Sequence, residues 1–552
     1  MIDSTCGGRG ICGRCRVIAG GELSPPDAAE VEHFAGRPED LRLACRAKVL
    51  GDVSVNVSDA WTKLECALGP QFRDVPLDSP LKRTALPRPG EGAIPYADTI
   101  PLKISDPRVL AKIASWDGNR ESFGVAFLDE LMDVEFDRSR VLGAAVDIGT
   151  TTLSLNLFDL ETGEFLNRSS AINPQTAYGG DVITRIAYCR ENAEGVSVLQ
   201  AALIAQVESM LDEVLAKVAE SRSHVRLVTA AGNTTMLHIL AGVNPLTLAL
   251  APFRPIFLRP LVIEAERCGL HIAQQGRLAL LPGASAYVGA DIVAGLTAID
   301  YRSCSGCTLF VDIGTNGEMV LLERTGRLLA TSCAMGPALE GMNISCGCRA
   351  VQGAIDSVTL CGDMTPRFTT IGGAPPTGLC GSGLVDLVAA LVCTGVIDPN
   401  GAFSHKISAT STGRLRGDRY YLTEHVFLSQ KDVRQVQLAK SAAITGILTL
   451  LSEAGLSVAD LERIIVGGSF GYHLDPENLK HIGLLPAEYM GRINMVGNSS
   501  LCGASLALIS HQIMKEMEEL ASAIRVVELG SHPDFSREFI SHLKFMPDCT
   551  QD

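Results

Sequence analysis

The sequence of 552 residues lacks a long apolar stretch, a basic region and a secretion signal. No uninterrupted apolar segment approaches the roughly 18 residues of a membrane-spanning helix, so we expect no membrane span. There is no Lys/Arg-rich run and the net charge is -15, so the positive surface that binds a nucleic-acid backbone is missing. The N-terminus has neither the basic region nor the apolar core of a signal peptide. These absences predict a cytoplasmic protein that binds neither a membrane nor nucleic acid.

The composition is otherwise that of a large globular protein. Hydrophobic residues make up 46% of the chain, which is enough for well-buried cores, and the length allows three or more domains. The chain contains 17 cysteines. Because the cytoplasm is reducing, we do not assign them to disulfides, and metal binding, redox chemistry or simple burial must account for them.

A short motif occurs twice in the chain. An apolar run leads into Asp-Ile-Gly-Thr-Thr-Thr at residues 147–152, and another leads into Asp-Ile-Gly-Thr-Asn-Gly-Glu at residues 312–318. Each copy predicts a strand, a tight turn and a second strand. The glycine lets the backbone approach a phosphate group closely, and the threonine hydroxyls offer donors to its oxygens. One copy alone is more typical of an ordinary hairpin, which stays open as the alternative, whereas two copies indicate a duplicated nucleotide-binding domain.

The residue types in the two motifs suggest separate roles. Asp147 and Asp312 are candidates to hold Mg²⁺ or its waters, because magnesium favours a few carboxylates together with the phosphates of its substrate. We group Glu318 with them as a candidate catalytic residue. A double glycine after the strand predicted at residues 463–466 lets the backbone lie against a purine or ribose. The candidate nucleotide-binding residues are Gly149, Thr150, Thr151, Thr152, Gly314, Thr315, Asn316, Gly467, Gly468 and Ser469.

Four cysteines near the N-terminus form a second motif, C-x5-C-x2-C-x29-C, made by Cys6, Cys12, Cys15 and Cys45. Three thiolates on a glycine-rich loop plus a distant fourth are typical of a [2Fe-2S] cluster. Zinc is the main alternative, but zinc sites usually consist of two separated close pairs. Ferredoxin folds of this type begin with a hairpin and a helix ahead of the cluster loop, and only five residues precede Cys6. We therefore expect a domain truncated at its N-terminus or a misassigned start.

The order of these motifs carries a family resemblance. The two Asp-x-Gly-x-Thr turns followed by Gly-Gly after a strand resemble the acetate kinase, sugar kinase, Hsp70 and actin superfamily. With the cluster loop in front, the chain resembles the ATP-dependent reductive activators of corrinoid proteins. Residues 231–236, 336–341, 430–440 and 475–478 also resemble that family, and the likeness covers nearly the whole chain. The chain departs from it in having Ser469 after the double glycine and many extra cysteines.

The resemblance implies a multidomain fold of α+β and α/β parts. It implies a ferredoxin-like domain of β-grasp fold at residues 1–60, followed by a proline-rich linker at 61–95 and a small middle domain at 96–139. A duplicated ribonuclease-H-like, actin/Hsp70-like ATPase domain then covers residues 140–530, in halves at 140–303 and 304–530, before a C-terminal tail at 531–552. Within it, we expect helices at about 196–219, 384–392 and 432–455 and a strand at 226–231.

The resemblance also implies a function and its cofactors, a [2Fe-2S] cluster and Mg-ATP. An electron passes from the cluster to the Co(II) corrinoid of a protein in a methyltransferase system and restores Co(I), while ATP drives the transfer. The electron donor to the cluster is not identified, and homodimers occur in the family. Two alternatives stay open: a phosphotransferase that carries a redox-sensing cluster, and an ATP-switched iron–sulfur scaffold.

Several further cysteines and histidines need a simpler explanation. Cys304-x2-Cys307 and Cys346-x-Cys348 have the spacing of redox pairs or of a second metal site, but cysteine is commonly a small buried hydrophobic residue. We expect His33, His238 and His473 to be structural or exposed rather than metal ligands.

Overall fold

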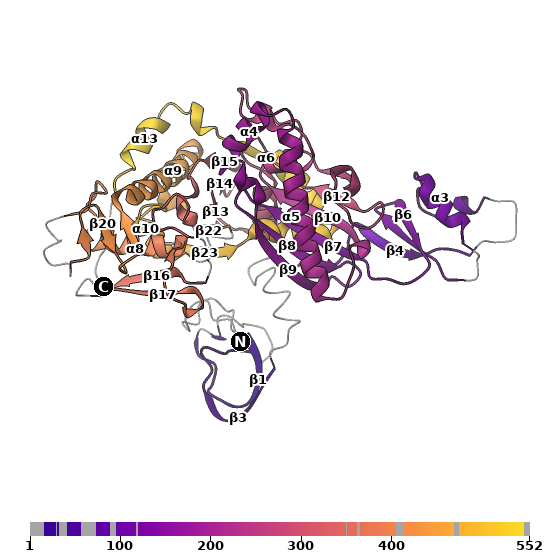
Figure 1. Ribbon diagram of the computed structural model, residues 1–552, viewed down its shortest axis with the longest axis horizontal. Helices are drawn as coiled ribbons and strands as arrows, with labels where there is room; N and C mark the ends of the chain where they lie inside the picture. Colours follow the sequence, from indigo (N-terminus) through magenta and orange to yellow (C-terminus); the bar gives the residue numbers. More distant parts are fainter. Residues whose placement is uncertain are drawn as a thin grey trace.

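The computed structural model describes residues 16–28, 30–31, 41–56, 73–88, 95–116, 120–348, 350, 352–361, 365–404, 413–468 and 474–545. Two large sheets dominate this part of the chain, and each forms the centre of one half of the body in Figure 1. None of the described helices has both the length and the apolar character of a membrane span.

The two large sheets share one plan. The first has the order β11-β12-β10-β7-β8-β9, and its core is the antiparallel run of β7 (Leu142–Ile148), β8 (Thr152–Asp159) and β9 (Phe165–Ile172). The second has the order β23-β22-β13-β14-β15-β24, and β13 (Thr308–Ile313) is antiparallel to β14. In each sheet a later strand lies parallel to the first one: β10 beside β7 and β22 beside β13. This repetition confirms the duplicated actin-like architecture.

The remaining strands of the two sheets come from several parts of the chain. They are β10 (Val225–Gly232), β11 (Leu261–Glu264), β12 (Arg277–Leu280), β14 (Gly317–Leu322), β15 (Leu328–Cys333), β22 (Arg463–Gly467), β23 (Arg492–Gly497) and β24 (Ile524–Val526).

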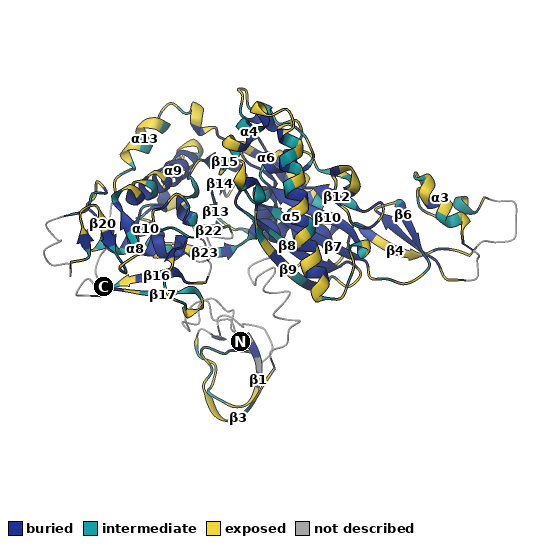
Figure 2. Cartoon of the chain, in the orientation of Figure 1, coloured by how far each residue is buried: buried dark blue, intermediate teal, exposed yellow. Residues whose placement is uncertain are grey.

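Helices cover the sheets and form the cores. The helices predicted in the three long apolar stretches are α5 (Gly195–Lys217), α8 (Gly381–Cys393) and α9 (Gln430–Ala454). Two more helices, α7 (Ala290–Ala298) and α11 (Ser499–Ile509), are almost entirely buried and pack against each other. Because α11 also contacts β7 and β10, the end of the chain completes the core of the first half. Figure 2 shows the buried interiors of the two halves.

The other helices are shorter than α5 and α9. They are α3 (Pro107–Ala114), α4 (Val182–Glu191), α6 (Thr234–Leu240), α10 (Pro476–His481), α12 (His511–Ala523) and α13 (Phe535–Ser541).

Four three-stranded sheets lie at the periphery. The N-terminal one is β1 (Arg16–Leu23), β2 (Leu41–Leu43) and β3 (Val49–Asn56). Two others belong to the second half: β16 (Ala354–Leu360) with β17 (Pro366–Thr370) and β18 (Gly378–Leu379), and β19 (Leu415–Arg416) with β20 (Arg419–Tyr421) and β21 (Phe427–Ser429). The fourth is made by β4 (Leu81–Ala85), β5 (Phe123–Phe127) and β6 (Glu130–Glu135), and it projects with α3 from one end of the body (Figure 1).

The range predicted as a proline-rich linker, 61–95, contains a strand. Its residues 81–85 form β4, which pairs with β5, so the small sheet begins inside that range. Just before β4, Asp78 forms a bridge with Ser510, and Arg73 forms an ion pair with Glu516 of α12. The range predicted as a C-terminal tail, 531–552, contains α13, which packs on α9. Both segments are held by partners far away in the sequence.

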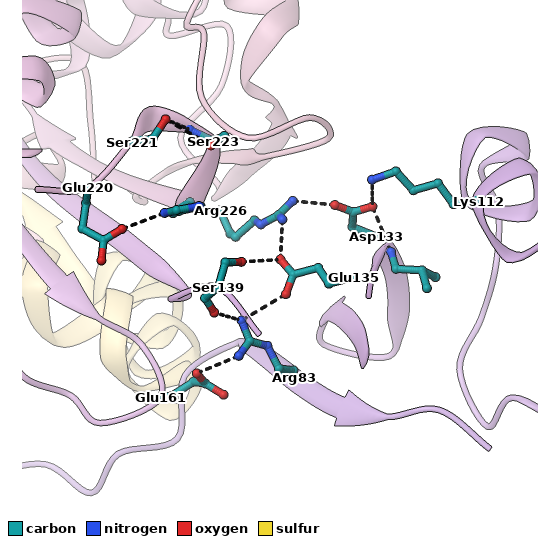
Figure 3. Close-up of polar contacts among 12 residues, drawn as sticks. Arg83, Lys112, Asp133, Glu135, Ser139, Glu161, Glu220, Ser221, Ser223 and Arg226 are labelled. Carbon is teal, nitrogen blue, oxygen red and sulfur yellow. Dashed lines mark hydrogen bonds and ion pairs between the residues drawn. The ribbon is translucent and has the colours of Figure 1, made fainter. Parts of the chain in front are cut away.

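A buried ion network joins the small sheet to the first half of the body, and Figure 3 shows it. Arg226 at the start of β10 donates to Asp133 of β6 at 2.7 Å and also binds Glu135. Arg83 of β4 lies 3.0 Å from Glu135 and 3.1 Å from Glu161, which follows β8. The side chains of Arg83, Asp133, Glu135 and Arg226 are only 3–8% exposed. The small sheet is therefore fixed to the body by charges that have little contact with water.

Candidate nucleotide site and cluster loop

The two turns predicted to bind phosphate face each other across the two halves. The hydroxyl oxygens of Thr151 and Thr315 lie 3.1 Å apart, and both residues are nearly buried. Thr315 also donates to Glu340 Oε1 at 2.8 Å. The structure thus brings the two copies of the motif to one place, as a nucleotide-binding cleft between duplicated halves requires.

The first turn is held from behind by three side chains. Asn173 Nδ2 donates to the Gly149 carbonyl at 2.9 Å, Asn233 Nδ2 donates to Thr150 Oγ1 at 3.0 Å, and Arg185 donates to the Thr150 carbonyl. A β-carbon on Gly149 would lie 2.5 Å from the Thr152 carbonyl oxygen, so this position requires glycine. These three donors fix the carbonyl groups of Gly149 and Thr150 and the hydroxyl group of Thr150.

The double glycine of β22 lies against the second turn. Gly468 has a φ of +94°, and a β-carbon there would be 2.6 Å from the Ile313 carbonyl oxygen and 2.8 Å from Asp312 Oδ1. Gly467 faces Ser499 at the start of α11. Close packing against the second turn therefore accounts for Gly468, and close packing against Ser499 accounts for Gly467. Ser469 lies outside the described residues.

Asp147 is fixed by the N-terminus of α11. Asn498, the residue that caps this helix, donates to Asp147 Oδ2 at 2.9 Å, and Ser500 donates to Oδ1 at 2.7 Å. Burial raises the pKa of Asp147, while these two hydrogen bonds oppose the rise. A helix from the end of the chain thus holds the acid of the first motif.

Asp291, in the first turn of α7, joins the acids that the sequence predicted. Burial and then the charge of Asp147 raise the pKa of Asp291 to about 7. Burial, followed by the charges of Asp291 and Asp147, raises the pKa of Asp312 to about 8. Burial and the charges of Asp291 and Asp312 raise the pKa of Glu318 well above its usual range. Asp147, Asp291, Asp312 and Glu318 thus form one acidic cluster, and sequence reasoning missed Asp291.

The remaining motif residues flank this acidic cluster. Thr152 begins β8, and Glu318 lies opposite Asp312 in the pairing of β13 with β14. Glu318 Oε1 accepts a hydrogen bond from Ser332 at 3.3 Å, and Asn316 also hydrogen-bonds its carboxylate. Among the described residues, no three His, Cys, Asp or Glu side chains form a ready-made metal site. Magnesium does not require one, because it keeps waters and takes phosphate oxygens as ligands.

Only one of the four predicted cluster ligands is described. Cys6, Cys12 and Cys15 lie outside the described residues. Cys45 is half-buried in the turn after β2. The buried ion pair of Arg42 with Glu30 at 3.0 Å fixes the strand that precedes this turn. A thiol at this partly exposed position fits the fourth ligand of a cluster near the protein surface.

His238 and several of the extra cysteines among the described residues are buried. His238 Nδ1 bonds the Thr234 carbonyl at 2.7 Å, and Nε2 accepts from the Ile256 N–H at 3.0 Å, so neither nitrogen is open to a metal. Cys307 is 2% exposed, and burial raises the pKa of its thiol to about 11. Cys333 is buried behind the second turn, and its thiol pKa is raised as well. These thiols are in their neutral form and are packed as hydrophobic side chains.

Comparison with known proteins agrees with this geometry. Residues 306–551 match the family model described as the C-terminal domain of RACo, the ASKHA domain, and residues 142–303 match the one described as the RACo middle region. The chain belongs to the RACo family. The RACo middle region coincides with the first six-stranded sheet, and the ASKHA domain contains the second.

Individual RACo-like proteins extend the match over the N-terminal part. The corrinoid activation enzyme RamQ of Eubacterium limosum is 28% identical, with 99% of this chain and 94% of RamQ covered. A Methanosarcina barkeri protein named [Co(II) methylated amine-specific corrinoid protein] reductase is 24% identical over 73% of this chain and 77% of its own length. The solved structure of a reductive activator for corrinoid, iron-sulfur protein has 28% identity and a TM-score of 0.79, and covers 99% of this chain and 93% of that one.

Proposed function

We propose that this protein is an ATP-dependent reductive activator of a corrinoid protein in a methyltransferase system. It transfers one electron from a [2Fe-2S] cluster to a Co(II) corrinoid and so restores Co(I). The observation that carries this proposal is the meeting of the two phosphate turns at Thr151 and Thr315, in a chain that also carries the cluster motif. The names of the two relatives and of the similar solved structure support the same reaction.

In this proposal the turns and the acids share the binding of Mg-ATP. No described residue accepts a hydrogen bond from the main-chain N–H of Thr150 or Thr151, so both are available to phosphate oxygens. Asp147 and Asp312 hold Mg²⁺ or its waters, with Asp291 and Glu318 beside them. The positive charge of the metal reduces the repulsion that raises the pKa values of these acids. Metal binding would therefore offset the repulsion among these buried carboxylates.

The redox part is assigned to Cys6, Cys12, Cys15 and Cys45. These thiolates would hold the cluster, which supplies one electron at a potential of roughly -400 mV in plant-type proteins. Each further ~59 mV of uphill transfer costs a factor of ten in the equilibrium. Nucleotide binding at the turns therefore has to favour a state of the complex in which the corrinoid is easier to reduce. A reducing cytoplasm is the compartment that we propose for this chemistry.

The decisive experiment follows the Co(I) absorption band anaerobically. Reduced protein and a Co(II) corrinoid protein are mixed with Mg-ATP, without nucleotide, or with a non-hydrolysable analogue, and ATP hydrolysis is measured in parallel. We expect Co(I) to form only with Mg-ATP and the corrinoid partner to stimulate hydrolysis. Equal reduction without nucleotide would refute the coupling. Hydrolysis or phosphate transfer without any Co(I), with several corrinoid proteins, would favour a phosphotransferase or a scaffold.

A further inference from the structure

Arg185 of α4 is the largest fully buried side chain among the described residues. Its guanidinium donates to the Gly179 carbonyl at 3.0 Å, to Gln175 Oε1 at 3.0 Å and to the Thr150 carbonyl. It also lies 3.1 Å from the sulfur of Met236. None of these four acceptors carries a charge, so this cation is hydrogen-bonded without being neutralised.

A buried cation without a carboxylate is unusual, because removing a charge from water is costly unless an opposite charge replaces the solvent. Burial lowers the pKa of Arg185 to about 10, and the charge of Asp181 opposes this only in part. The side chain therefore stays positively charged at neutral pH. An isolated protein gains little from such a charge, since an uncharged donor would serve the same carbonyl groups.

The position of the Arg185 charge next to the turn at residues 149–152 suggests a role in binding phosphate. Arg185 holds the carbonyl of Thr150, and the N–H groups of Thr150 and Thr151 belong to the same turn. The guanidinium thus lies directly behind the backbone that faces the cleft. Charges interact over several ångströms in a poorly solvated interior. The attraction between Arg185 and a bound nucleotide would grow with the number of phosphate charges, whereas uncharged adenosine would gain almost nothing from it.

We propose that Arg185 is a positioning residue whose unneutralised charge, held behind the turn at residues 149–152, strengthens the binding of nucleotide phosphates in step with their negative charge. This inference depends on the proposed function, because it assumes that the turn binds ATP. The alternative is a purely structural arginine, which fixes the turn by its hydrogen bonds alone and would support all ligands of the cleft equally.

Gln175 offers a way to neutralise Arg185 without removing it. The Gln175→Glu substitution places a carboxylate at the oxygen that already accepts from Arg185. It loses the bond from Gln175 Nε2 to the Leu199 carbonyl, 3.0 Å long. Gln175→Met is the matched control, because it loses both hydrogen bonds of Gln175 but leaves the charge of Arg185 uncompensated. Comparing the two variants separates charge from packing.

The test measures Kd for ATP, ADP, AMP and adenosine, each with Mg²⁺, by titration calorimetry on the full chain. We expect Gln175→Glu to weaken ATP about tenfold and adenosine less than about twofold, with ADP and AMP in between. In Gln175→Met, any loss should be about equal for all four ligands. The ratio of the Kd for ATP to the Kd for adenosine should be nearer the wild-type value in Arg185→Lys than in Arg185→Met. This second pair of variants tests the inference if Gln175→Glu does not fold.

The outcomes distinguish this inference from the proposed function. If the wild-type protein binds no nucleotide, the nucleotide site itself is wrong. If it binds ATP normally but Gln175→Glu and Arg185→Met weaken ATP and adenosine by the same factor, Arg185 is structural and the inference fails. Unchanged ATP affinity in both variants would overturn it as well.

Discussion

The hydroxyl groups of Thr151 and Thr315 lie 3.1 Å apart although the residues are 164 positions apart in the chain. Because Thr315 donates to Glu340, the bond between the two hydroxyls runs from Thr151 to Thr315. A phosphate group that enters between the turns has to displace or bridge this bond. In the proposed function, binding of a nucleotide between the turns would therefore be coupled to the relative position of the two halves, which is the requirement for a nucleotide to change the state of the protein.

Thr315→Val tests this relationship. The variant loses the hydroxyl that donates to Glu340 and accepts from Thr151, so no hydroxyl remains at residue 315 to turn from Glu340 toward an entering phosphate. A hydrogen bond to a charged group contributes about 1.5–3 kcal/mol, so ATP binding should weaken roughly tenfold or more. Titration calorimetry with ATP measures the effect, and Thr325→Val, in the exposed loop before β15, is the control. Wild-type affinity in Thr315→Val would show that the hydroxyl takes no part in binding.

Asp312→Asn and Asp291→Asn should each lower the ATPase activity and raise the stability of the ligand-free protein. Each removes a carboxylate whose pKa is raised by burial and by neighbouring acids, so the ligand-free variants should melt at a higher temperature than the wild type. ATP turnover should fall about 100-fold or more, because the metal loses a ligand or its neighbour. Asp418→Asn, on an exposed turn, is the control. Unchanged turnover in Asp291→Asn would remove this residue from the site.

Cys45→Ser should abolish the [2Fe-2S] absorption while ATP binding stays at the wild-type level. Cys45 lies in the turn after β2, outside the two large sheets that carry the phosphate turns, so the loss should be confined to redox chemistry. Iron and sulfide content and the visible spectrum are measured on anaerobically prepared protein. Cys304→Ser, which alters a half-buried cysteine of the body, is expected to keep the cluster. Full cluster content in Cys45→Ser would reject this residue as a ligand.

The sequence predicted the parts of the site that a local motif encodes. Strand, turn and strand at Asp147 and Asp312 follow from apolar runs interrupted by Asp and Gly, and the structure contains both. Asp291 was missed because it lies in an apolar helix, Ala290–Ala298, and is not part of an Asp-x-Gly-x-Thr motif. Only the packing of α7 against α11 brings it to the other acids. Its local signal was a single acidic residue at the start of a buried helix.

The boundaries of the peripheral parts could not be predicted from the sequence either, because they too depend on contacts between residues far apart in the chain. The prolines around residues 70–95 predicted a linker, yet β4 forms there because Leu81–Ala85 can pair with Phe123–Phe127. That pairing lies about 40 residues away in the chain, and no local pattern indicates it. Likewise α13 is short and half-exposed, and its place on α9 depends on side chains far upstream, such as Ser441, which donates to the Phe539 carbonyl.

Arg226→Met should loosen the small sheet from the body. The variant leaves Asp133 and Glu135 buried with less positive charge, and breaking a buried ion pair in this way costs about 3–5 kcal/mol. We expect a lower melting temperature and faster proteolysis of the small sheet. Arg168→Met, at an exposed site on β9, is the control. The triple variant Arg226→Met, Asp133→Asn and Glu135→Gln should melt at a higher temperature than Arg226→Met alone. If it does not, unpaired buried carboxylates are not the cause of the lost stability.

Lys440 of α9 predicts a stability change at alkaline pH. Its side chain is 2% exposed, donates to the Lys544 carbonyl and lies 5.3 Å from the Phe545 ring. Burial lowers the pKa of Lys440 to about 8. An unfolded lysine keeps its proton to about pH 10.4, so between these two values only the unfolded state is protonated. The free energy of unfolding should therefore rise with pH across this window, by at most about 3 kcal/mol.

Lys440→Met isolates this contribution, because other titrating groups are common to both proteins. Below pH 8 the wild type bears the full cost of a buried charge, and as the pH rises to 10 that cost disappears. The melting temperature of the wild type minus that of Lys440→Met should therefore increase between pH 7.5 and pH 10, whereas the same difference for Lys515→Met, at an exposed position on α12, should stay constant. If the melting-temperature difference between the wild type and Lys440→Met does not change with pH, the folded protein keeps the proton on this lysine. The Lys440 ammonium group would then be in contact with water beneath the C-terminal segment.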